Sequence, residues 1–555
     1  MSAADRQAIR RAIADLKSMP LLSVVLPYPS LRPDFAQRRA LVSLSGQLYP
    51  HWEALVAEGL RDSNDDARIV SVRTRQDDAA SLYNAAVERA SGTFVLILPP
   101  DAVLAEHALY ELAHAIAANP GLELVFTDED QLDAEGVRWK PYFKTDWDPD
   151  LMLGRDGVGM VAAIRTETVR RLGGMRGGTG IELGQYELVL RVGHSAAPRR
   201  IHHIPAVLCH RRLGCDGGSW DSEGARAVVR RHLGMIGVAG ARVEVAPLAP
   251  AWNRVVRPVP QPAPLVTVIV PTRDGADILA ACVEGVLFRT DYAPVELLIV
   301  DNDSRDPETL ELLARLARDS QVRVIRFPGA FNYSAINNAA VAAARGEVIV
   351  LMNNDTDVIH AGWLTELVSH AVRPEVGVVG AKLLYGDGRV QHCGVTLGRG
   401  PALIHQLRLS DRLDPGLNGA LALTRSVSAV TGACLAMRKS VFQEVGGLDE
   451  VNLKLAFNDV DLCLRVGDHG YRVICTPFAE LFHLELLTRG YDDTPEKQCA
   501  NQKELQAFRL MWEPLMERDP YHNPNVLYQS DGTRWASPSR RRPPWAAWRT
   551  EALVA

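Results

Sequence analysis

Residues 347–357 read Glu-Val-Ile-Val-Leu-Met-Asn-Asn-Asp-Thr-Asp, an apolar run that ends abruptly in carboxamides and carboxylates. The run has the composition of a buried strand, and ligands of open α/β sheets lie beyond the carboxyl ends of the strands. Asp355 and Asp357 therefore fall where a substrate is expected, and their oxygen atoms suit Mg²⁺ or Mn²⁺. The alternative is a turn that merely ends the strand, since Asn, Asp and Thr all favour turns.

Two further apolar segments end in polar clusters of the same kind. Residues 266–270, Val-Thr-Val-Ile-Val, run into Pro271 and Thr272, and residues 295–300, Val-Glu-Leu-Leu-Ile-Val, run into Asp301. An amphipathic helix is predicted after each of these strands, so the local plan is a repeated strand, helix and strand. This plan predicts a parallel sheet with one functional edge.

Residues 456–465, Ala-Phe-Asn-Asp-Val-Asp-Leu-Cys-Leu-Arg, predict the start of a helix. Asn458 or Asp459 is the expected N-cap. At about 100° per residue, Asp459 lies on the apolar side of this helix, whereas Asp461 points toward Arg465 one turn later. Asp461 is therefore interpreted as half of a surface ion pair, and Asp459 as the acid available for chemistry. The alternative for Asp459 is a helix cap and no more.

Several signatures follow one another along the second half of the chain: Val-Ile-Val-Pro-Thr, Val-Asp-Asn-Asp-Ser, Asn-Asn-Ala-Ala, Leu-Met-Asn-Asn-Asp-Thr, Thr-Gly-Ala-Cys-Leu, Val-Gly-Gly-Leu-Asp-Glu, Asn-Asp-Val-Asp-Leu-Cys-Leu-Arg and a late His. Through them, residues 265–490 resemble the family 2 inverting glycosyltransferases of the GT-A fold. Each signature is weak alone, but their order and spacing make the match specific. The resemblance implies a nucleotide-diphosphate sugar as donor and a divalent cation, Mn²⁺ or Mg²⁺, as cofactor.

The resemblance also implies a role for each matching residue. Asp459 matches the general base. The residues implied in binding the donor nucleotide are Pro271, Thr272, Asp301, Asn338 and Asn354; those implied in holding the metal are Asp355, Asp357 and His483; and those implied in binding the acceptor are Thr431, Gly432, Ala433 and Asn458. Two positions depart from the family pattern, because Asn353 replaces the first acid of the metal motif and Asn458 replaces the Glu that usually precedes the base.

The implied reaction inverts the anomeric centre of the sugar in one displacement. Asp459 removes the proton of an acceptor hydroxyl as its oxygen attacks, and the cation neutralises the departing diphosphate. The resemblance implies a glycan or lipid-linked acceptor in the synthesis of a surface polysaccharide such as an O-antigen or a capsule. The donor sugar and the linkage depend on pocket shape and cannot be read from the sequence.

The first half of the chain follows the same plan in a degenerate form. Residues 92–98, Gly-Thr-Phe-Val-Leu-Ile-Leu, precede Pro-Pro-Asp101, so prolines stand where the second half has carboxamides. In residues 182–191, the apparent counterpart of the base segment, Gln185 replaces the acid, and a carboxamide accepts no proton at neutral pH. The expected fold class is α/β, with two GT-A-like domains in tandem, each with a Rossmann-like and mostly parallel sheet. Only the C-terminal domain is expected to be catalytic.

One segment of the first half is rich in acidic and aromatic residues. It comprises residues 126–133 and 140–150, and its composition is typical of surfaces that hold sugars by stacking and hydrogen bonds. The first half is therefore expected to bind acceptor glycan or to position its neighbour. The alternative is a solvated loop with aromatic anchors.

A length of 555 residues predicts two or three domains. The expected divisions are an N-terminal helix over residues 1–19, a degenerate domain over 20–241, a proline-rich linker over 242–264, a catalytic domain over 265–525 and a polar, basic tail over 526–555. The prolines of the linker predict that it contains neither helix nor strand. The tail is expected to be mobile.

Composition narrows the class of partner. The net charge is −6, from 61 basic and 67 acidic residues, so nucleic-acid binding is not expected. Eight cysteines form no Cys-x-x-Cys pair, which disfavours a structural zinc site and favours buried thiols in a reducing compartment. With no apolar run long enough to span a bilayer and no signal sequence, the expected location is cytoplasmic. Peripheral association with the inner face of the membrane stays open because acceptors of such enzymes are often lipid-linked.

Three other classes of protein are weighed against the transferase. A Rossmann dehydrogenase is disfavoured because no Gly-x-Gly-x-x-Gly follows either first strand. A non-catalytic glycan-binding scaffold is supported by Asn353 and Asn458 but opposed by the acids that remain. A bifunctional polymerase with two active sites is opposed by the loss of acids from the first half.

Overall fold

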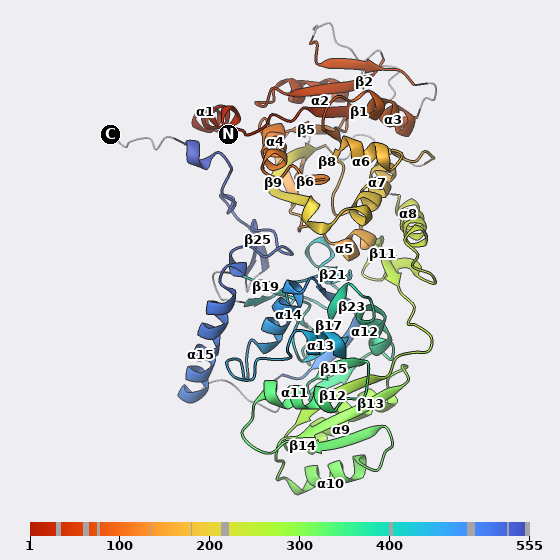
Figure 1. The fold of residues 1–555 in the computed structure, drawn as a ribbon, viewed down its shortest axis with the longest axis vertical. Coiled ribbons are helices and arrows are strands. Elements are labelled where there is room, and N and C mark those ends of the chain that lie inside the picture. The colour runs from red at the N-terminus through yellow and green to blue at the C-terminus, as the bar shows by residue number, and fades with distance from the viewer. Residues whose placement is uncertain are drawn as a thin grey trace, which may run out of the picture. The chain divides into compact units, whose positions relative to one another are not determined.

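The chain folds into two domains, each built on one large sheet (Figure 1). The computed structural model describes residues 1–28, 35–58, 66–74, 78–133, 135–178, 180–212, 221–398, 403–485, 494–529 and 532–549. Domain 1 comprises Met1–Ala239, Asn523–Leu527 and Trp535–Ala555, and domain 2 comprises Gly240–His522 and Tyr528–Arg534.

Domain 1 begins with a helix, as predicted for residues 1–19. Its elements are α1 (Ala3–Ala14), β1 (Leu22–Leu26), α2 (Phe35–Ser45), β2 (Trp52–Ala57), β3 (Ile69–Val72), α3 (Ala79–Arg89), β4 (Phe94–Ile97), β5 (Ala102–Leu104), α4 (Ala108–Ala118), β6 (Leu124–Leu132), β7 (Arg138–Tyr142), α5 (Pro149–Gly154), β8 (Ala162–Arg165), α6 (Thr166–Arg171), α7 (Ile181–Ser195), β9 (Ile201–Arg211) and α8 (Ser222–Met235). The strand order of its sheet is β3-β2-β1-β4-β8-β6-β9-β5, with β7 added beside β6.

Domain 2 contains the predicted catalytic segment. Its elements are β10 (Arg242–Ala246), β11 (Ala249–Val256), β12 (Val266–Thr272), α9 (Ala276–Phe288), β13 (Val295–Asp301), α10 (Pro307–Leu316), β14 (Val322–Arg326), α11 (Tyr333–Ala343), β15 (Val348–Met352), β16 (Thr356–Val358), α12 (Trp363–Ala371), β17 (Val376–Leu384), β18 (Val390–His392), β19 (Val395–Leu397), β20 (Leu403–His405), β21 (Arg425–Ser426), β22 (Cys434–Arg438), α13 (Lys439–Glu444), α14 (Asn458–Asp468), β23 (Arg472–His483) and α15 (Pro495–Trp512). Helices α9 and α10 confirm those predicted around residues 278–288 and 307–318.

The two sheets share one strand path. The order in domain 2 is β14-β13-β12-β15-β22-β17-β23-β16, which repeats the path of domain 1 strand for strand, and β18 lies beside β17 as β7 lies beside β6. Strand β21, which pairs with β23, is an addition in domain 2. The parallel and antiparallel pairings also agree, since the first four strands of each path are parallel and the later ones are mixed. This repetition confirms the predicted α/β class and the tandem arrangement of two like domains.

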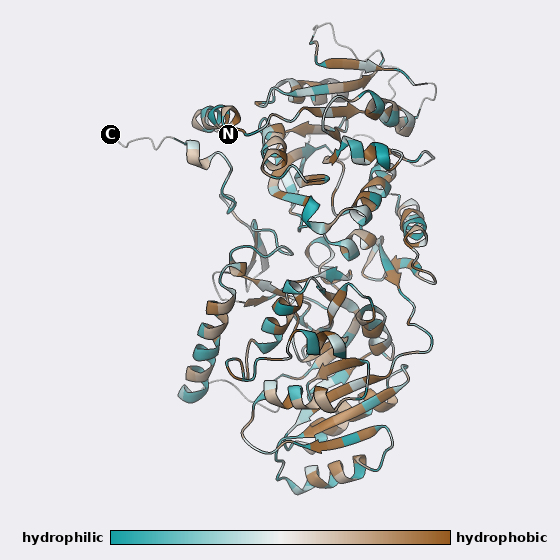
Figure 2. Ribbon diagram, viewed as in Figure 1, coloured by the Kyte–Doolittle hydropathy of each residue, from teal (hydrophilic) through white to brown (hydrophobic). Residues whose placement is uncertain are grey.

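Apolar layers cover both faces of the domain 2 sheet. Alternation along β12 directs Val268 and Val270 into one buried cluster and Ile269 into the other. Every residue of β12, β13 and β15 is buried, which explains why these strands are near-continuous apolar runs in the sequence. Figure 2 shows these strands largely brown, while the helices around them carry teal stripes.

The parallel strands bring their carboxyl ends to one edge of the sheet. Thr272, the last residue of β12, pairs in register with Asp301, the last residue of β13. Strand β15 lies on the other side of β12 and continues into Asn353. At the far end of the strand path, His483 of β23 pairs with Thr356 of β16, which carries the late histidine to the same edge. This edge is the one that the sequence predicts to be functional.

The proline-rich linker departs from its prediction. Strands β10 and β11 pair as an antiparallel hairpin, so the expectation that residues 242–264 hold no strand is wrong for 242–256. Their prolines do not interrupt the ladder, because Pro247 lies in the turn and Pro250 lies in a bulge between the paired residues Ala249 and Asn253. Residues 257–264, which carry four of the prolines, contain no helix or strand.

The C-terminal segment is not a free tail over its described residues. Strands β24 (Val526–Gln529) and β25 (Gly532–Trp535) pair with each other. Further on, the indole of Trp545 is buried and donates a hydrogen bond to Asp5 of α1, and Arg541 pairs with the buried Glu111 of α4. The prediction of a mobile end is wrong for these residues, because aromatic and basic side chains anchor them to domain 1. Among the described helices, none is long and apolar enough to cross a membrane.

Candidate active site

A pocket of about 590 Å³ opens at the carboxyl edge of the domain 2 sheet. Its walls come from the ends of β12 and β15, from the turn before β22, from the start of α14 and from β20. The predicted site residues that line it are Pro271, Thr272, Asn354, Thr431, Gly432, Ala433, Asn458 and Asp459. Predicted residues up to 188 positions apart in the sequence thus share one cavity, which contains the predicted base, the predicted acceptor residues and three of the predicted donor residues.

Asp459 is held on the pocket wall by two backbone donors. Its Oδ2 accepts the N–H of Gly432 at 2.8 Å, and its Oδ1 accepts the N–H of Val460 at 2.8 Å. The inward direction expected from helical periodicity brings it to the pocket. The predicted N-cap is wrong, because Phe457 is the N-cap, in the left-handed region at φ 62°, and no side chain caps the helix. The carboxylate is therefore available for chemistry in the pocket.

Tyr333 fixes the turn that holds Asp459. Its hydroxyl donates to the carbonyl oxygen of Gly432 at 3.0 Å, and burial raises its pKa, so the phenol keeps the proton that makes this bond. A Cβ atom at Gly432 would lie 2.9 Å from the same hydroxyl and 3.5 Å from Cβ of Asp459. The first distance is too short and the second is an ordinary contact, so glycine is needed here for the close approach to Tyr333.

The segment after β15 is fastened to its neighbours. Asn354 donates from Nδ2 to Oγ1 of Thr272 at 3.1 Å, and the N–H of Asn353 donates to the carbonyl oxygen of Ala433 at 3.0 Å. These bonds join the ends of β12 and β15 to the turn beside Asp459. Asn458 is 3% exposed, and among the described residues its Nδ2 has no hydrogen-bond partner. A buried amide on a pocket wall is suited to a polar substrate atom.

His483 and Asp355 lie side by side next to the pocket. Nε2 of His483 is 3.2 Å from Oδ1 of Asp355 and 3.2 Å from Nδ2 of Asn353. On the other side of the ring, Nδ1 lies 2.7 Å from Oε1 of Gln391. The Nε2 atom of Gln391 donates to the backbone oxygen of His483 and to Glu485, and these two acceptors fix which end of the amide faces the ring.

This arrangement fixes the protonation of Nδ1 of His483. Because Oε1 of Gln391 only accepts, Nδ1 carries a hydrogen, and the Nε2 lone pair of the neutral ring points toward the Asp355 carboxylate. Two acceptors 3.2 Å apart repel unless a proton or a cation lies between them. Asp355 and His483 could hold a divalent cation there, and Gln391 would be the outer partner that ligating histidines usually have.

We therefore expect Gln391→Leu to lower Mn²⁺ affinity in the presence of nucleotide by about 10- to 100-fold, the usual cost of losing such a partner. Electron paramagnetic resonance of free Mn²⁺ measures this affinity directly. Gln443→Leu, at an exposed glutamine of α13, is the matched control and should leave the affinity unchanged. Equal Mn²⁺ affinity in Gln391→Leu and wild type would contradict the role given to Gln391.

Besides Asp355 and His483, three further predicted residues do not line the pocket and make contacts elsewhere. Asp357 of β16 forms an ion pair with Arg289 at the end of α9, so the structure does not bring its carboxylate to Asp355. Asn338 donates to the carbonyl oxygen of Leu448 and accepts the Leu448 N–H, which fastens a loop. Asp301 accepts the N–H of Ser304 at 2.9 Å.

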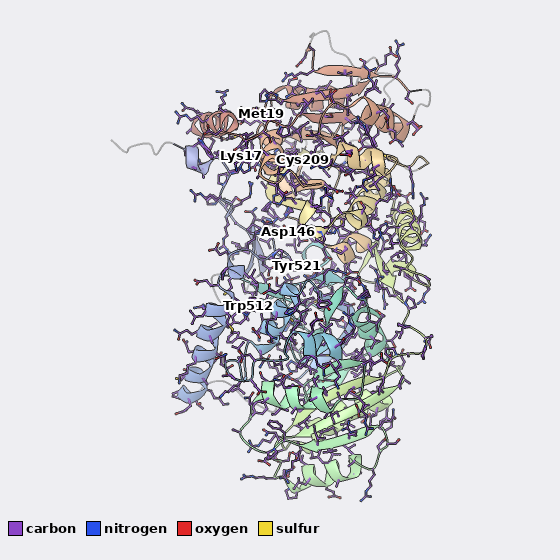
Figure 3. The ribbon with its side chains drawn as sticks, viewed as in Figure 1. Lys17, Met19, Asp146, Cys209, Trp512 and Tyr521 are labelled. Carbon is purple, nitrogen blue, oxygen red and sulfur yellow. The ribbon has the colours of Figure 1, made fainter. Side chains whose placement is uncertain are left out.

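Asp461 pairs with Arg465 as predicted, but the pair is not at the surface. Oδ2 of Asp461 accepts two N–H bonds from Arg465, at 2.7 and 2.9 Å, and the residue is 1% exposed. Its Oδ1 accepts the indole N–H of Trp512 at 3.0 Å. Trp512, labelled in Figure 3, ends α15 and covers the pair from a distant part of the chain. The surface location is therefore wrong, and the pair anchors α14 inside domain 2.

Comparison with known proteins agrees with this geometry. Residues 267–446 match the model of the family described as glycosyl transferase family 2. This match lies within domain 2. The chain is 36% identical to the protein y4gI of Sinorhizobium fredii over 559 residues, covering 96% of this chain and 61% of that protein. It is 37% identical to O-antigen biosynthesis protein RfbC of Myxococcus xanthus over 536 residues, covering 94% of this chain and 41% of that protein.

The chain thus spans about three fifths and two fifths of the lengths of these two relatives. Among solved structures, the mannosyltransferase PcManGT of Pyrobaculum calidifontis, in complex with GDP-Man and Mn²⁺, is 20% identical with a TM-score of 0.35. That similarity covers 47% of this chain and 70% of the other.

Domain 1 can be compared with domain 2 residue by residue through the shared topology. In α7, Arg191 pairs with Glu187 four residues earlier, as Arg465 pairs with Asp461 in α14. This match places Gln185 at the position of Asp459; Gln185 is 1% exposed. At the position of Asp355, Asp101 pairs with Arg211 at 3.0 Å.

Arg211 occupies the register position of His483. It pairs with Ala102 of β5 as His483 pairs with Thr356 of β16 in domain 2. Burial lowers the pKa of Arg211, but the neighbouring Asp101 and other acids raise it by more, so the guanidinium stays charged. A permanent cation therefore lies beside Asp101, where domain 2 has His483 beside Asp355.

The acidic side chains of residues 126–133 and 140–150 mostly make contacts within domain 1. Asp128 is fully buried and accepts from Nδ2 of Asn523 and from the N–H of Lys144, and His203 lies 2.9 Å from it. Asp130 binds Arg138 and His210. Burial lowers the pKa of His203, but the surrounding acids raise it by more, so the pKa is raised overall. These contacts tie the C-terminal segment to the sheet and leave Asp128 no access to a sugar.

Sequence reasoning missed several residues of the pocket in domain 2. They are Arg273, Phe331, Tyr333, His405 and Glu485 on its walls, with Gln391 behind His483. Arg273 directly follows the Pro-Thr pair and could have been found from that position. The others lie in loops or on segments whose local pattern gives no sign that they face the same cavity.

Proposed function

We propose that the protein is an inverting glycosyltransferase that moves a sugar from a nucleotide-diphosphate donor to a hydroxyl group of a glycan or lipid-linked acceptor. The observation that carries the proposal is Asp459, held by the N–H groups of Gly432 and Val460 in the same pocket as Thr272 and Asn354. The O-antigen role named for RfbC, a relative along most of this chain, supports synthesis of a surface polysaccharide as the setting.

The reaction follows from the position of this carboxylate. Asp459 accepts the proton of the acceptor hydroxyl while the hydroxyl oxygen forms its bond to the anomeric carbon. The bond from that carbon to the diphosphate oxygen breaks on the opposite face, and its electron pair leaves with the nucleoside diphosphate. One displacement inverts the anomeric centre, so the site needs no second carboxylate as nucleophile.

The donor lies, in this proposal, along the ends of β12 and β15. Pro271, Thr272 and Asn354 shape this wall, and Asp301 beyond it accepts a hydrogen bond from the nucleotide base. Arg273 is exposed on the same wall and has no hydrogen-bond partner among the described residues, so its guanidinium is available to the diphosphate. Asn338 acts indirectly, by fastening the loop at Leu448.

Asp355 and His483 would hold a divalent cation, Mn²⁺ or Mg²⁺, which would supply charge neutralisation for the departing diphosphate. On the acceptor side, the turn of Thr431, Gly432 and Ala433 and the unpartnered amide of Asn458 face the incoming saccharide. Domain 1 is non-catalytic in this proposal, because Gln185 and Arg211 stand in place of the base and of the metal-side histidine.

The test begins with calorimetric titration of the whole chain with UDP, GDP and dTDP, first with Mn²⁺ and then with EDTA. We expect one nucleotide to bind near one site per chain and to lose affinity when the metal is removed. Incubation with the matching nucleotide sugar and a panel of p-nitrophenyl glycosides should then give a product of inverted anomeric configuration by NMR. Absence of binding to all three nucleotides would refute the proposal and favour a glycan-binding scaffold.

A further inference from the structure

Two histidines outside the predicted site form a pair at the pocket. His392 ends β18 and is buried, while His405 ends β20 and lines the pocket beside Asp459 and Glu485. Their Nδ1 atoms are 3.0 Å apart. Nitrogen atoms this close share one hydrogen, so one ring donates and the other accepts. Which ring donates decides what His405 presents to a substrate.

The backbone around His392 settles the direction of this bond. Nε2 of His392 accepts the N–H of Thr431 at 3.3 Å and the N–H of Gly394 at 3.3 Å. An atom that accepts from two N–H groups carries no hydrogen, so the hydrogen of the neutral ring is on Nδ1. His392 therefore donates to His405, and Nδ1 of His405 is the acceptor.

Burial keeps His392 in this neutral form. It lowers the pKa of His392 well below the ordinary value, and the nearby His405 and Arg425 lower it further. An imidazolium would carry hydrogens on both nitrogens and would oppose the N–H groups of Thr431 and Gly394. Geometry and charge thus agree on a single tautomer for the buried ring.

The tautomer of His405 follows from its neighbour. Since Nδ1 accepts, the hydrogen of the neutral His405 ring is on Nε2, on the edge opposite His392. His405 is exposed on the pocket wall, and among the described residues Nε2 has no hydrogen-bond partner. The pocket thus contains one oriented, uncharged N–H donor close to the carboxylate that is the proposed base.

We propose that His405 binds the acceptor, donating from Nε2 to an oxygen of the acceptor saccharide next to the hydroxyl that Asp459 deprotonates, and that His392 positions it by fixing its tautomer. The inference rests on the proposed function of the same pocket. The hydrogen bond from His405 selects acceptors with an oxygen at that place. Asp459 remains the base, because Nε2 of His405 already carries its hydrogen. His392 also links this donor to the Thr431 turn that holds Asp459 through Gly432.

The main test uses His405→Phe, which keeps a ring and removes the donor, and His405→Gln, whose amide can place an N–H near the same position. With the p-nitrophenyl glycoside that wild type uses best, we expect His405→Phe to raise the acceptor KM about tenfold, as loss of one hydrogen bond can. His405→Gln should stay within about threefold of wild type. Nucleotide affinity by calorimetry should be unchanged in both, which also shows that the domain is folded.

A spectroscopic measurement tests the tautomer without any activity. Protein labelled with ¹⁵N in the histidine rings should give the Nε2–H pattern for His405, assigned as the signal lost in His405→Gln. His392→Phe should shift that pattern toward a mixture of tautomers and raise the acceptor KM while the nucleotide affinity stays constant. A merely structural role for His392 would lower stability without moving the tautomer.

The outcomes separate this inference from the function on which it rests. An Nδ1–H tautomer for His405, an unchanged acceptor KM in His405→Phe, or an effect on donor KM instead would overturn the inference while transfer itself continues. If wild type binds no nucleotide and transfers no sugar, the proposed function fails, and the acceptor role of His405 fails with it.

Discussion

Asp459→Asn should lower the rate of sugar transfer by at least about 100-fold while nucleotide affinity stays at the wild-type level. The carboxamide oxygen can still accept the N–H of Gly432, which keeps the bond to the turn and gives up the one from the N–H of Val460, but it cannot take the proton of the acceptor hydroxyl. Initial rates with saturating donor and acceptor, together with calorimetric titration of the bound nucleotide, measure both quantities on one preparation.

Asp468→Asn is the matched control, because this exposed acid lies at the other end of the same helix. It should transfer sugar at the wild-type rate. Wild-type turnover in Asp459→Asn would place the base elsewhere. A parallel loss of nucleotide affinity would instead mean that Asp459 contacts the donor.

Asp355→Ala should abolish the metal-dependent part of nucleotide binding and lower the nucleotide affinity by at least about 100-fold. Loss of an outer partner alone costs up to about 100-fold in metal affinity, and loss of a ligand should cost at least as much. The physical reason is the 3.2 Å approach of Asp355 to Nε2 of His483, which provides two ligand atoms for one cation. Calorimetry with nucleotide and Mn²⁺, repeated in EDTA, should give the same weak affinity in both buffers for this variant.

Asp101→Ala, at the equivalent position of domain 1, is the control for this experiment. Its carboxylate already pairs with Arg211, so its removal should leave nucleotide binding and transfer near wild type. If Asp101→Ala instead lost as much as Asp355→Ala, domain 1 would contain an active site. If Asp355→Ala kept its response to EDTA, the cation would be bound by other residues.

Local sequence pattern predicted the sheet edge well. The apolar runs before Thr272, Asp301 and Asn353 are strands buried on both faces, and an all-apolar strand of that kind is recognisable from its own residues. Helical periodicity likewise predicted that Asp459 points inward and that Asp461 pairs with Arg465. These features depend on neighbours within one turn or one strand, so the sequence determines them.

The burial of Asp461 and the tautomer of His392 depend on residues far away in the sequence. Asp461 is buried because Trp512 covers it from α15, and no pattern within α14 could indicate that. His392 acquires its tautomer from the backbone of Thr431, 39 residues later. The sequence of residues 390–405 shows two histidines and a glutamine but not that they meet the ends of β15 and β23.

The sequence by itself determined the α/β class, the tandem repeat, the carboxyl edge of the second sheet and the acid that points into it, because each is written in local periodicity or in repeated motifs. Only the tertiary structure decided that Asp357 turns to Arg289, that Gln391 orients His483, that His405 presents an N–H donor to the pocket, and that the C-terminal segment is anchored to domain 1. The physical reason is that these features come from side chains and backbone groups brought together by packing of distant segments, and a hydrogen-bond partner that arrives from another part of the chain leaves no mark on the residues around it.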